Sequence, residues 1–169
     1  MSIEYTNILS RLSKEGIDYV VIGGVAAALH GSTYHTLDID ICFDFSPSNL
    51  LKLQKALRDI HPVHRMTPGR IPLQLTQDNC RDIKNLYLDT DLGQLDCIGF
   101  VQGIGDFKEV KKNSQRMKMQ DYFVQVLNAT AVIEAKKSLN RDHDREAIRQ
   151  LEIIQKMQNK KTNKEFKNG

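Results

Sequence analysis

The chain has 169 residues, a length that suits one domain with a sizeable core, and its 40% hydrophobic and 27% charged residues exclude wholesale disorder. Its three cysteines are widely spaced and include no CxxC pair, which argues against a disulfide framework and against a structural zinc site. The first eleven residues lack the pattern of a secretion leader and no apolar run is long enough to span a bilayer, so we expect a cytoplasmic protein that does not enter membranes.

In the N-terminal half, predicted helices alternate with predicted strands. Apolar spacing and capping residues predict helices at residues 3–14, at residues 25–30 and from residue 46 onward. β-Branched composition and strict alternation predict strands at residues 17–22 and 37–45. Gly31 is well placed to cap the second helix at its C-terminus. The third helix has a core-facing apolar stripe at Leu50, Leu53, Leu57 and Ile60.

The C-terminal half contains further strands and then helices. A loop is predicted at residues 61–69, and strands follow at residues 71–77, 83–88, 94–100 and 122–127. Gly99, Gly103 and Gly105 predict little regular structure before a basic connection to the last of these strands. Helices are predicted at residues 129–139 and 142–157, and a polar tail follows them.

This order of elements predicts an α/β fold of the α+β kind, in which helices flank a mixed sheet and further helices follow it. We expect a single domain over residues 1–158, with an α/β core at residues 1–128 and C-terminal helices at residues 129–158. The basic segment 159–169 is expected to be a flexible tail.

Two carboxylates share one face of the strand predicted at residues 37–45. Side chains two positions apart point the same way on a strand, so Asp38 and Asp40 lie side by side while Ile39 and Ile41 face the core. Adjacent like charges repel unless a cation lies between them, and hard carboxylate oxygens suit Mg²⁺. Taken alone, the pattern is more often an amphipathic strand with a solvated acidic face.

A glycine pair precedes this strand at the point where the previous strand gives way to a helix. Gly23 and Gly24 leave no Cβ in the way of the backbone N–H groups, an arrangement that favours phosphate. Neither the P-loop pattern nor the dinucleotide-binding pattern follows the pair, so a tight turn is the alternative interpretation.

A third carboxylate, Asp96, interrupts an otherwise apolar predicted strand. An unpaired charge there is costly, so Asp96 needs either a basic partner or a metal ion. If its strand lies beside residues 37–45, Asp96 completes a triad with Asp38 and Asp40. Three carboxylates can hold two Mg²⁺ ions, of which one aligns a triphosphate and one lowers the pKa of an attacking hydroxyl.

The sequence resembles the nucleotidyltransferase superfamily, whose fold is that of the DNA polymerase β catalytic core. The resemblance lies in residues that occur in a set order, namely Gly23-Gly24, Thr36, the pair Asp38 and Asp40, and then Asp96. The resemblance covers about the first two-thirds of the chain. It implies that Asp38, Asp40 and Asp96 are the catalytic metal ligands, with two Mg²⁺ ions expected and Mn²⁺ as a substitute. It also implies that an NTP is the substrate, with Gly23, Gly24 and Thr36 near its phosphates.

A second segment, which includes Lys136, Arg141 and Asp144, resembles the helical Lys…Arg…Lys-Asp segment of small AbiEii-like nucleotidyltransferases, many of them toxin components. The resemblance implies that Lys136 and Arg141 lie near nucleotide phosphates and that Asp144 either holds this segment or assists the chemistry. Without the resemblance, exposed helix surface is the better interpretation of both basic residues. Thr36 has two open roles, at the strand entry or on a phosphate.

The resemblance implies transfer of a nucleoside monophosphate to an acceptor hydroxyl, with RNA such as a tRNA 3′ end as the acceptor and an antitoxin-like protein as a partner. Basic clusters after residue 107 are compatible with RNA, although lysine-rich surfaces also serve solubility. One alternative is an enzyme that modifies an aminoglycoside. The other is a degenerate nucleotide-binding or regulatory module, because His35 and His143 stand where the family often has basic arginine and lysine.

Overall fold

The computed structural model describes residues 3–34 and 36–165, with side chains for residues 5–34 and 36–160. His35, one of the two departures from the family pattern, lies outside the described residues. Within the described part, no helix is both long enough and apolar enough to cross a membrane.

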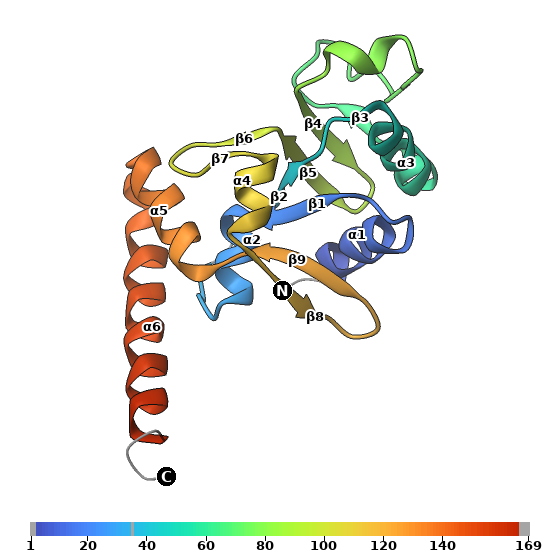
Figure 1. Ribbon diagram of the computed structural model, residues 1–169. Coiled ribbons are helices and arrows are strands. Elements are labelled where there is room, and N and C mark those ends of the chain that lie inside the picture. The colour runs from blue at the N-terminus through green and yellow to red at the C-terminus, as the bar shows by residue number, and fades with distance from the viewer. Residues whose placement is uncertain (1–2, 35, 166–169) are drawn as a thin grey trace.

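A mixed seven-stranded sheet forms the centre of the molecule (Figure 1). Its strands, in spatial order, are β3 (Val63–His64), β4 (Asn85–Thr90), β5 (Gly93–Ile98), β2 (Asp38–Phe43), β1 (Tyr19–Ile22), β9 (Phe123–Leu127) and β8 (Ser114–Lys118). The pairs β2–β5 and β1–β9 are parallel, and the other neighbours are antiparallel. This sheet agrees with the predicted mixed α/β fold. A separate hairpin is formed by β6 (Phe100–Val101) and β7 (Gly105–Asp106).

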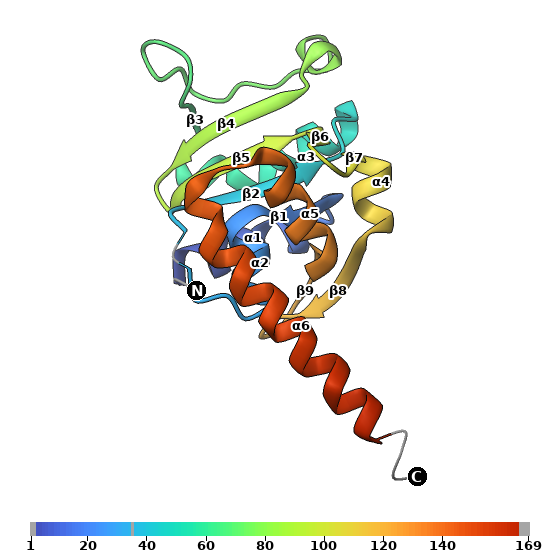
Figure 2. The same ribbon diagram turned by 90° about the vertical axis from the view of Figure 1, so that its left-hand side faces the viewer.

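Helices cover both sides of the sheet. The α-helices are α1 (Ile3–Lys14), α2 (Gly23–Leu29), α3 (Pro47–Leu57), α4 (Phe107–Lys112), α5 (Ala129–Leu139) and α6 (Arg145–Glu165). Short 3₁₀ turns lie at η1 (Arg58–Ile60), η2 (Asn79–Asp82) and η3 (Asp142–Asp144). Figures 1 and 2 show α1 and α3 on one side of the sheet and α5 with α6 on the other, while the C-terminal half of α6 projects away from the body.

The core is the apolar interior between these layers. The strand residues Ile39 and Ile41 are fully buried, as the alternation of β2 predicts. The predicted apolar stripe is buried as well, at Leu50, Leu53 and Leu57 of α3 and at Ile60 of η1. Removing this apolar surface from water stabilises the fold and leaves the opposite face of β2, with its two aspartates, directed away from the core.

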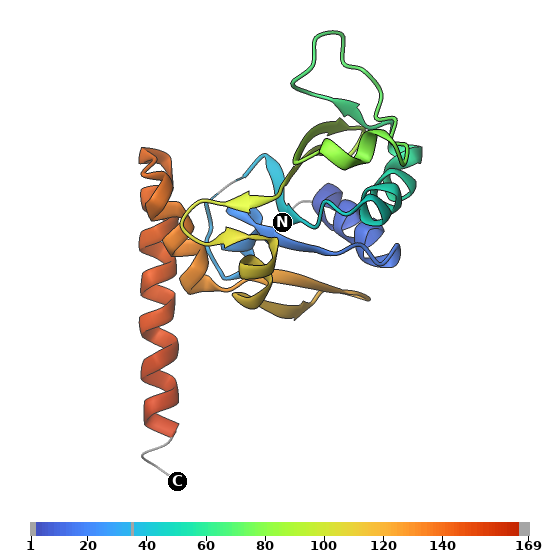
Figure 3. The same ribbon diagram turned by 45° about the horizontal axis from the view of Figure 1, so that its top comes forward.

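The strand predicted at residues 71–77 is wrong. The segment forms only one isolated bridge, between Val63 and Pro72, and it lies in the long β3–β4 connection that extends from the sheet edge (Figure 3). Pro72 has no N–H to donate to a ladder, and the Leu75 N–H donates to the side chain of Gln54 instead. The backbone therefore finds partners without a strand.

The basic connection before the last strand has more regular structure than the glycines predict. It contains β7, α4 and β8, because Asp106 caps α4 by accepting a hydrogen bond from the Glu109 N–H and because β8 pairs with the whole of β9. The positive φ angles of Gly103 and Gly105 are used in the tight β6–β7 hairpin.

The last helix is longer than predicted. After the η3 turn, α6 continues to Glu165, so residues 159–165 of the segment predicted as a flexible tail are helical. The helix predicted at residues 25–30 starts two residues earlier, and the glycine pair is its first turn. Gly31 has the positive φ angle of a helix C-terminal residue, and its N–H bonds to the carbonyl of Ala28.

Candidate functional site

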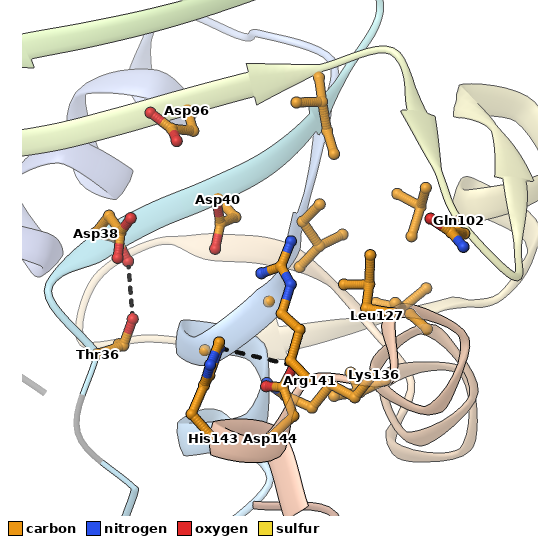
Figure 4. A pocket seen from close by; sticks show the side chains of 18 of the residues that line it. Thr36, Asp38, Asp40, Asp96, Gln102, Leu127, Lys136, Arg141, His143 and Asp144 are labelled. Carbon is orange, nitrogen blue, oxygen red and sulfur yellow. Dashed lines mark hydrogen bonds and ion pairs between the residues drawn. The ribbon is translucent and has the colours of Figure 1, made fainter. Parts of the chain in front are cut away.

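A cavity of about 910 Å³ lies between the sheet and the C-terminal helices, and all nine predicted site residues line it (Figure 4). These residues come from four places in the chain, namely the start of α2, strand β2 with the turn before it, strand β5, and the segment from α5 to η3. They are Gly23, Gly24, Thr36, Asp38, Asp40, Asp96, Lys136, Arg141 and Asp144.

The three aspartates are brought together by the parallel pairing of β2 and β5. Asp40 is directly opposite Asp96 in the register, and Asp38 is two residues earlier on the same strand. One carboxylate oxygen from each residue lies within 4.8 Å of the others. All three side chains are partly exposed to the cavity, so the β2–β5 pair forms an acidic wall of hard oxygen donors.

The crowding of negative charge in this arrangement affects the pKa of Asp40. Its pKa is raised to about 7, first by burial and then by the neighbouring charges of Asp38 and Asp96, although Lys136 and Arg141 lower it. A carboxyl that resists ionisation beside two others favours a bound cation. The donor set therefore fits a divalent cation such as Mg²⁺.

The glycine pair makes room for two of the site side chains. A Cβ on Gly23 would overlap the Asp40 carboxylate, and a Cβ on Gly24 would lie 2.5 Å from Thr36 Oγ1. Gly23 also has φ of +62°, a conformation that other residues rarely adopt. The Thr36 hydroxyl donates to the Asp38 carbonyl at 3.2 Å, so Thr36 supports the entry to β2.

Opposite the acidic wall, Lys136 and Asp144 form a buried ion pair. Lys136 Nζ donates to Asp144 Oδ1, and the side chains are only 10% and 5% exposed. The interpretation of Lys136 as exposed helix surface is therefore wrong. His143 lies at the edge, with Nε2 3.9 Å from Asp144 Oδ2.

Arg141 is the exposed cation of this wall. It follows Asn140, whose left-handed conformation ends α5, and Figure 4 shows its guanidinium extending into the cavity toward Asp40. Its charge lowers the pKa of Asp40. Within the described part of the chain it makes no ion pair closer than 4.0 Å, so its hydrogen-bond donors are available to a ligand.

Arg65 belongs to the site and is missed by the sequence prediction. It follows β3, its Nη2 donates to Asp96 Oδ1, and its guanidinium lies 5.9 Å from the centre of the Tyr87 ring. Its Nε is buried without a hydrogen-bond partner in the described structure. The cost of Asp96 on an apolar strand indicates that a partner is needed, but the sequence does not show that a loop 31 residues away supplies it.

Comparisons with known proteins agree with the fold. No family model matches the chain, and no curated protein matches it in sequence. Among solved structures, the crystal structure of a candidate nucleotidyltransferase from Thermotoga maritima matches with a TM-score of 0.54 and 18% identity, over 92% of this chain and 91% of that one. The chain therefore has a nucleotidyltransferase-like fold, and the predicted fold class is confirmed.

Proposed function

We propose that the protein is a Mg²⁺-dependent nucleotidyltransferase that moves a nucleoside monophosphate from an NTP to an acceptor hydroxyl. The single observation that carries this proposal is the Asp38, Asp40 and Asp96 triad on adjacent strands of a nucleotidyltransferase-like fold, facing a large cavity. In the reaction, the acceptor oxygen forms a bond to the α-phosphorus and the bond to pyrophosphate breaks.

The triad would hold the metal, with two Mg²⁺ ions expected and Mn²⁺ as a substitute. A bound divalent cation would neutralise triphosphate charge and lower the pKa of the attacking hydroxyl. Asp38 and Asp40 would be ligands, and Asp96 would serve as a ligand or as the base toward the acceptor. Since Arg65 bonds to one Asp96 oxygen, the state of that ion pair decides how much of Asp96 is free for this role.

The helical wall would bind the nucleotide. Arg141 extends into the cavity with its charge unpaired in the described chain, so it is the best placed cation for the triphosphate. Lys136 adds charge, although Asp144 already neutralises much of it and holds the segment in place. Gly23, Gly24 and Thr36 would border the phosphates from the other side.

An RNA acceptor, such as a tRNA 3′ end in a toxin–antitoxin-like setting with a partner protein, is the acceptor we favour. Its support is the surplus of basic residues in the later part of the chain and the resemblance to AbiEii-like enzymes. An aminoglycoside-modifying activity needs an acidic pocket beyond the triad, and the opposite wall supplies the cation Arg141 beside the Lys136–Asp144 ion pair instead.

The test is incubation of the protein with each labelled NTP, Mg²⁺ and total RNA. We expect label in RNA, and we expect Asp40→Asn to reduce it about a hundredfold or more. Asp78→Asn, on the exposed β3–β4 connection, is the matched control and should retain the activity. Label on protein alone would redirect the acceptor assignment.

Calorimetric titration with each NTP, with and without Mg²⁺, separates the enzyme from a regulatory module. Metal-dependent NTP binding together with turnover supports the enzyme. Binding without turnover would favour the non-catalytic module, and an absence of metal-dependent binding would overturn the catalytic proposal.

A further inference from the structure

A second cavity of about 520 Å³ opens beside the first and shares Asn85 and Phe100 with it. It lies where β2 and β5 end and where the β6–β7 hairpin and α4 begin. No residue of the proposed metal and nucleotide sites lines it. Its lining includes aromatic and charged side chains, among them Asp44, Phe45, Lys84, Phe100, Asp106 and Lys108.

Aromatic rings dominate this second cavity. Phe100 is 63% exposed, and it stands at the boundary with the main cavity. Phe45 packs edge-to-face on buried Phe43, with ring centres 5.0 Å apart. A Cβ on Gly99 would contact the Phe45 ring at 3.4 Å, so the absence of a side chain at this position leaves that part of the ring uncovered. The cavity therefore offers exposed aromatic surface to a flat partner.

Two lysines and two aspartates line this cavity, so their formal charges cancel, but only the lysine side chains are without a partner in the part of the chain that the structure describes. Lys84 and Lys108 are exposed, and neither forms an ion pair with any residue that the structure describes. The two aspartates of the cavity already have partners, since Asp44 accepts from the Ser46 hydroxyl and Asp106 caps α4. Free ammonium groups beside exposed rings are complementary to a base with its phosphate.

We infer that this second cavity binds a base and an adjacent phosphate of a single-stranded RNA acceptor, with the base against Phe100 and Phe45 and the phosphate on Lys84 and Lys108. The inference rests on the proposed function for the identity of the acceptor. Along β2, Phe43 of this cavity follows Asp40 by three residues, about 10 Å, so the bound base belongs to a nucleotide upstream of the reacting 3′ end.

The experiment measures RNA binding without NTP or divalent metal, so it does not depend on catalysis. A fluorescein-labelled single-stranded RNA of about ten nucleotides is titrated with the full-length protein and followed by fluorescence anisotropy. Phe100→Ala should weaken binding roughly fivefold or more, because a base loses its stacking surface. Phe123→Ala removes another exposed aromatic side chain, on β9 and away from the cavity, and should bind as the wild type does.

The lysines are tested through the salt dependence of the same binding. The slope of log affinity against log salt is negative, and Lys84→Gln and Lys108→Gln should each make it shallower by about 0.7. Lys118 is an exposed lysine on β8, and Lys118→Gln should leave the slope unchanged. The same RNA annealed into a duplex should bind more weakly than the single strand, because paired bases are not free to stack on the rings.

The outcomes separate this inference from the proposed function. Absence of RNA binding, or equal binding by the wild type and Phe100→Ala, overturns the second cavity as an acceptor site even if nucleotide transfer to another acceptor is found. Binding that falls in Phe100→Ala and in both lysine variants but persists in Asp40→Asn supports the RNA site even if no transfer activity is found.

Discussion

The two walls of the main cavity differ in how far their charged side chains are paired with opposite charges. On the sheet wall, three partly exposed carboxylates stand side by side, and burial with mutual repulsion raises the pKa of Asp40 to about 7. On the helical wall, Lys136 and Asp144 neutralise each other with little exposure to solvent. The unbalanced wall is arranged for a ligand, whereas the balanced pair holds the structure and leaves Arg141 to reach the cavity.

The largest effect on stability is expected at the balanced pair. Asp144→Asn leaves the Lys136 ammonium buried without a counter-ion and should lower the free energy of unfolding by about 3–5 kcal/mol. Urea denaturation measures this change. Glu152→Gln, which breaks the exposed ion pair with Lys137, is the control and should have little effect. Equal losses in the two variants would contradict the structural role of the buried pair.

Asp40 should make the metal-free protein less stable as the pH rises. Its folded pKa of about 7 exceeds the ordinary 3.8, so its contribution to stability is present in full below about pH 4 and is lost as the pH rises through 7. The difference is a few kcal/mol. Denaturation at several pH values should show the decline in the wild type and a weaker one in Asp40→Asn. The same decline in the variant would mean that other groups cause it.

Gly23→Ala tests whether the glycine pair positions the acidic wall. The added Cβ meets the Asp40 carboxylate and the residue has a positive φ, so we expect a loss of about 1–3 kcal/mol in the free energy of unfolding and weaker metal binding. Gly16→Ala is a matched control because its φ is also positive but no atom lies within 4 Å of the added Cβ. If the two substitutions have equal effects on metal binding, the contact with Asp40 is unimportant.

The smallest expected effect sharpens the role of Arg65. Arg65→Gln removes a cation that bonds to Asp96, so the affinity of the triad for Mn²⁺ should increase about tenfold. Calorimetric titration with Mn²⁺ measures both affinity and the number of ions bound. Arg70→Gln removes a nearby arginine in the β3–β4 connection that pairs with Asp89 of β4, and it should leave both values unchanged. Unchanged Mn²⁺ binding in Arg65→Gln would show that the ion pair does not compete with metal.

Much of the fold could be predicted because the signals are local. Helix α1 has the predicted bounds, and alternation along residues 37–45 correctly places Ile39 and Ile41 in the core. The failures have a common cause. The segment 71–77 has strand composition but no ladder to join, while β8 forms because β9 offers a free edge. Strand formation depends on a partner, and residue composition does not show that partner.

By itself, the sequence determined that Asp38 and Asp40 share a strand face, because side chains two positions apart on a strand point the same way. It also determined that Asp96 requires a counter-charge, because burying an unpaired charge is costly. The position of the glycine pair before the three aspartates is read directly from the sequence. Only the tertiary structure decided that Asp96 lies opposite Asp40 while bonding to Arg65, and that Lys136 is buried against Asp144. Strand register and the return of the C-terminal helices bring these groups together, and both arise from packing between distant segments of the chain.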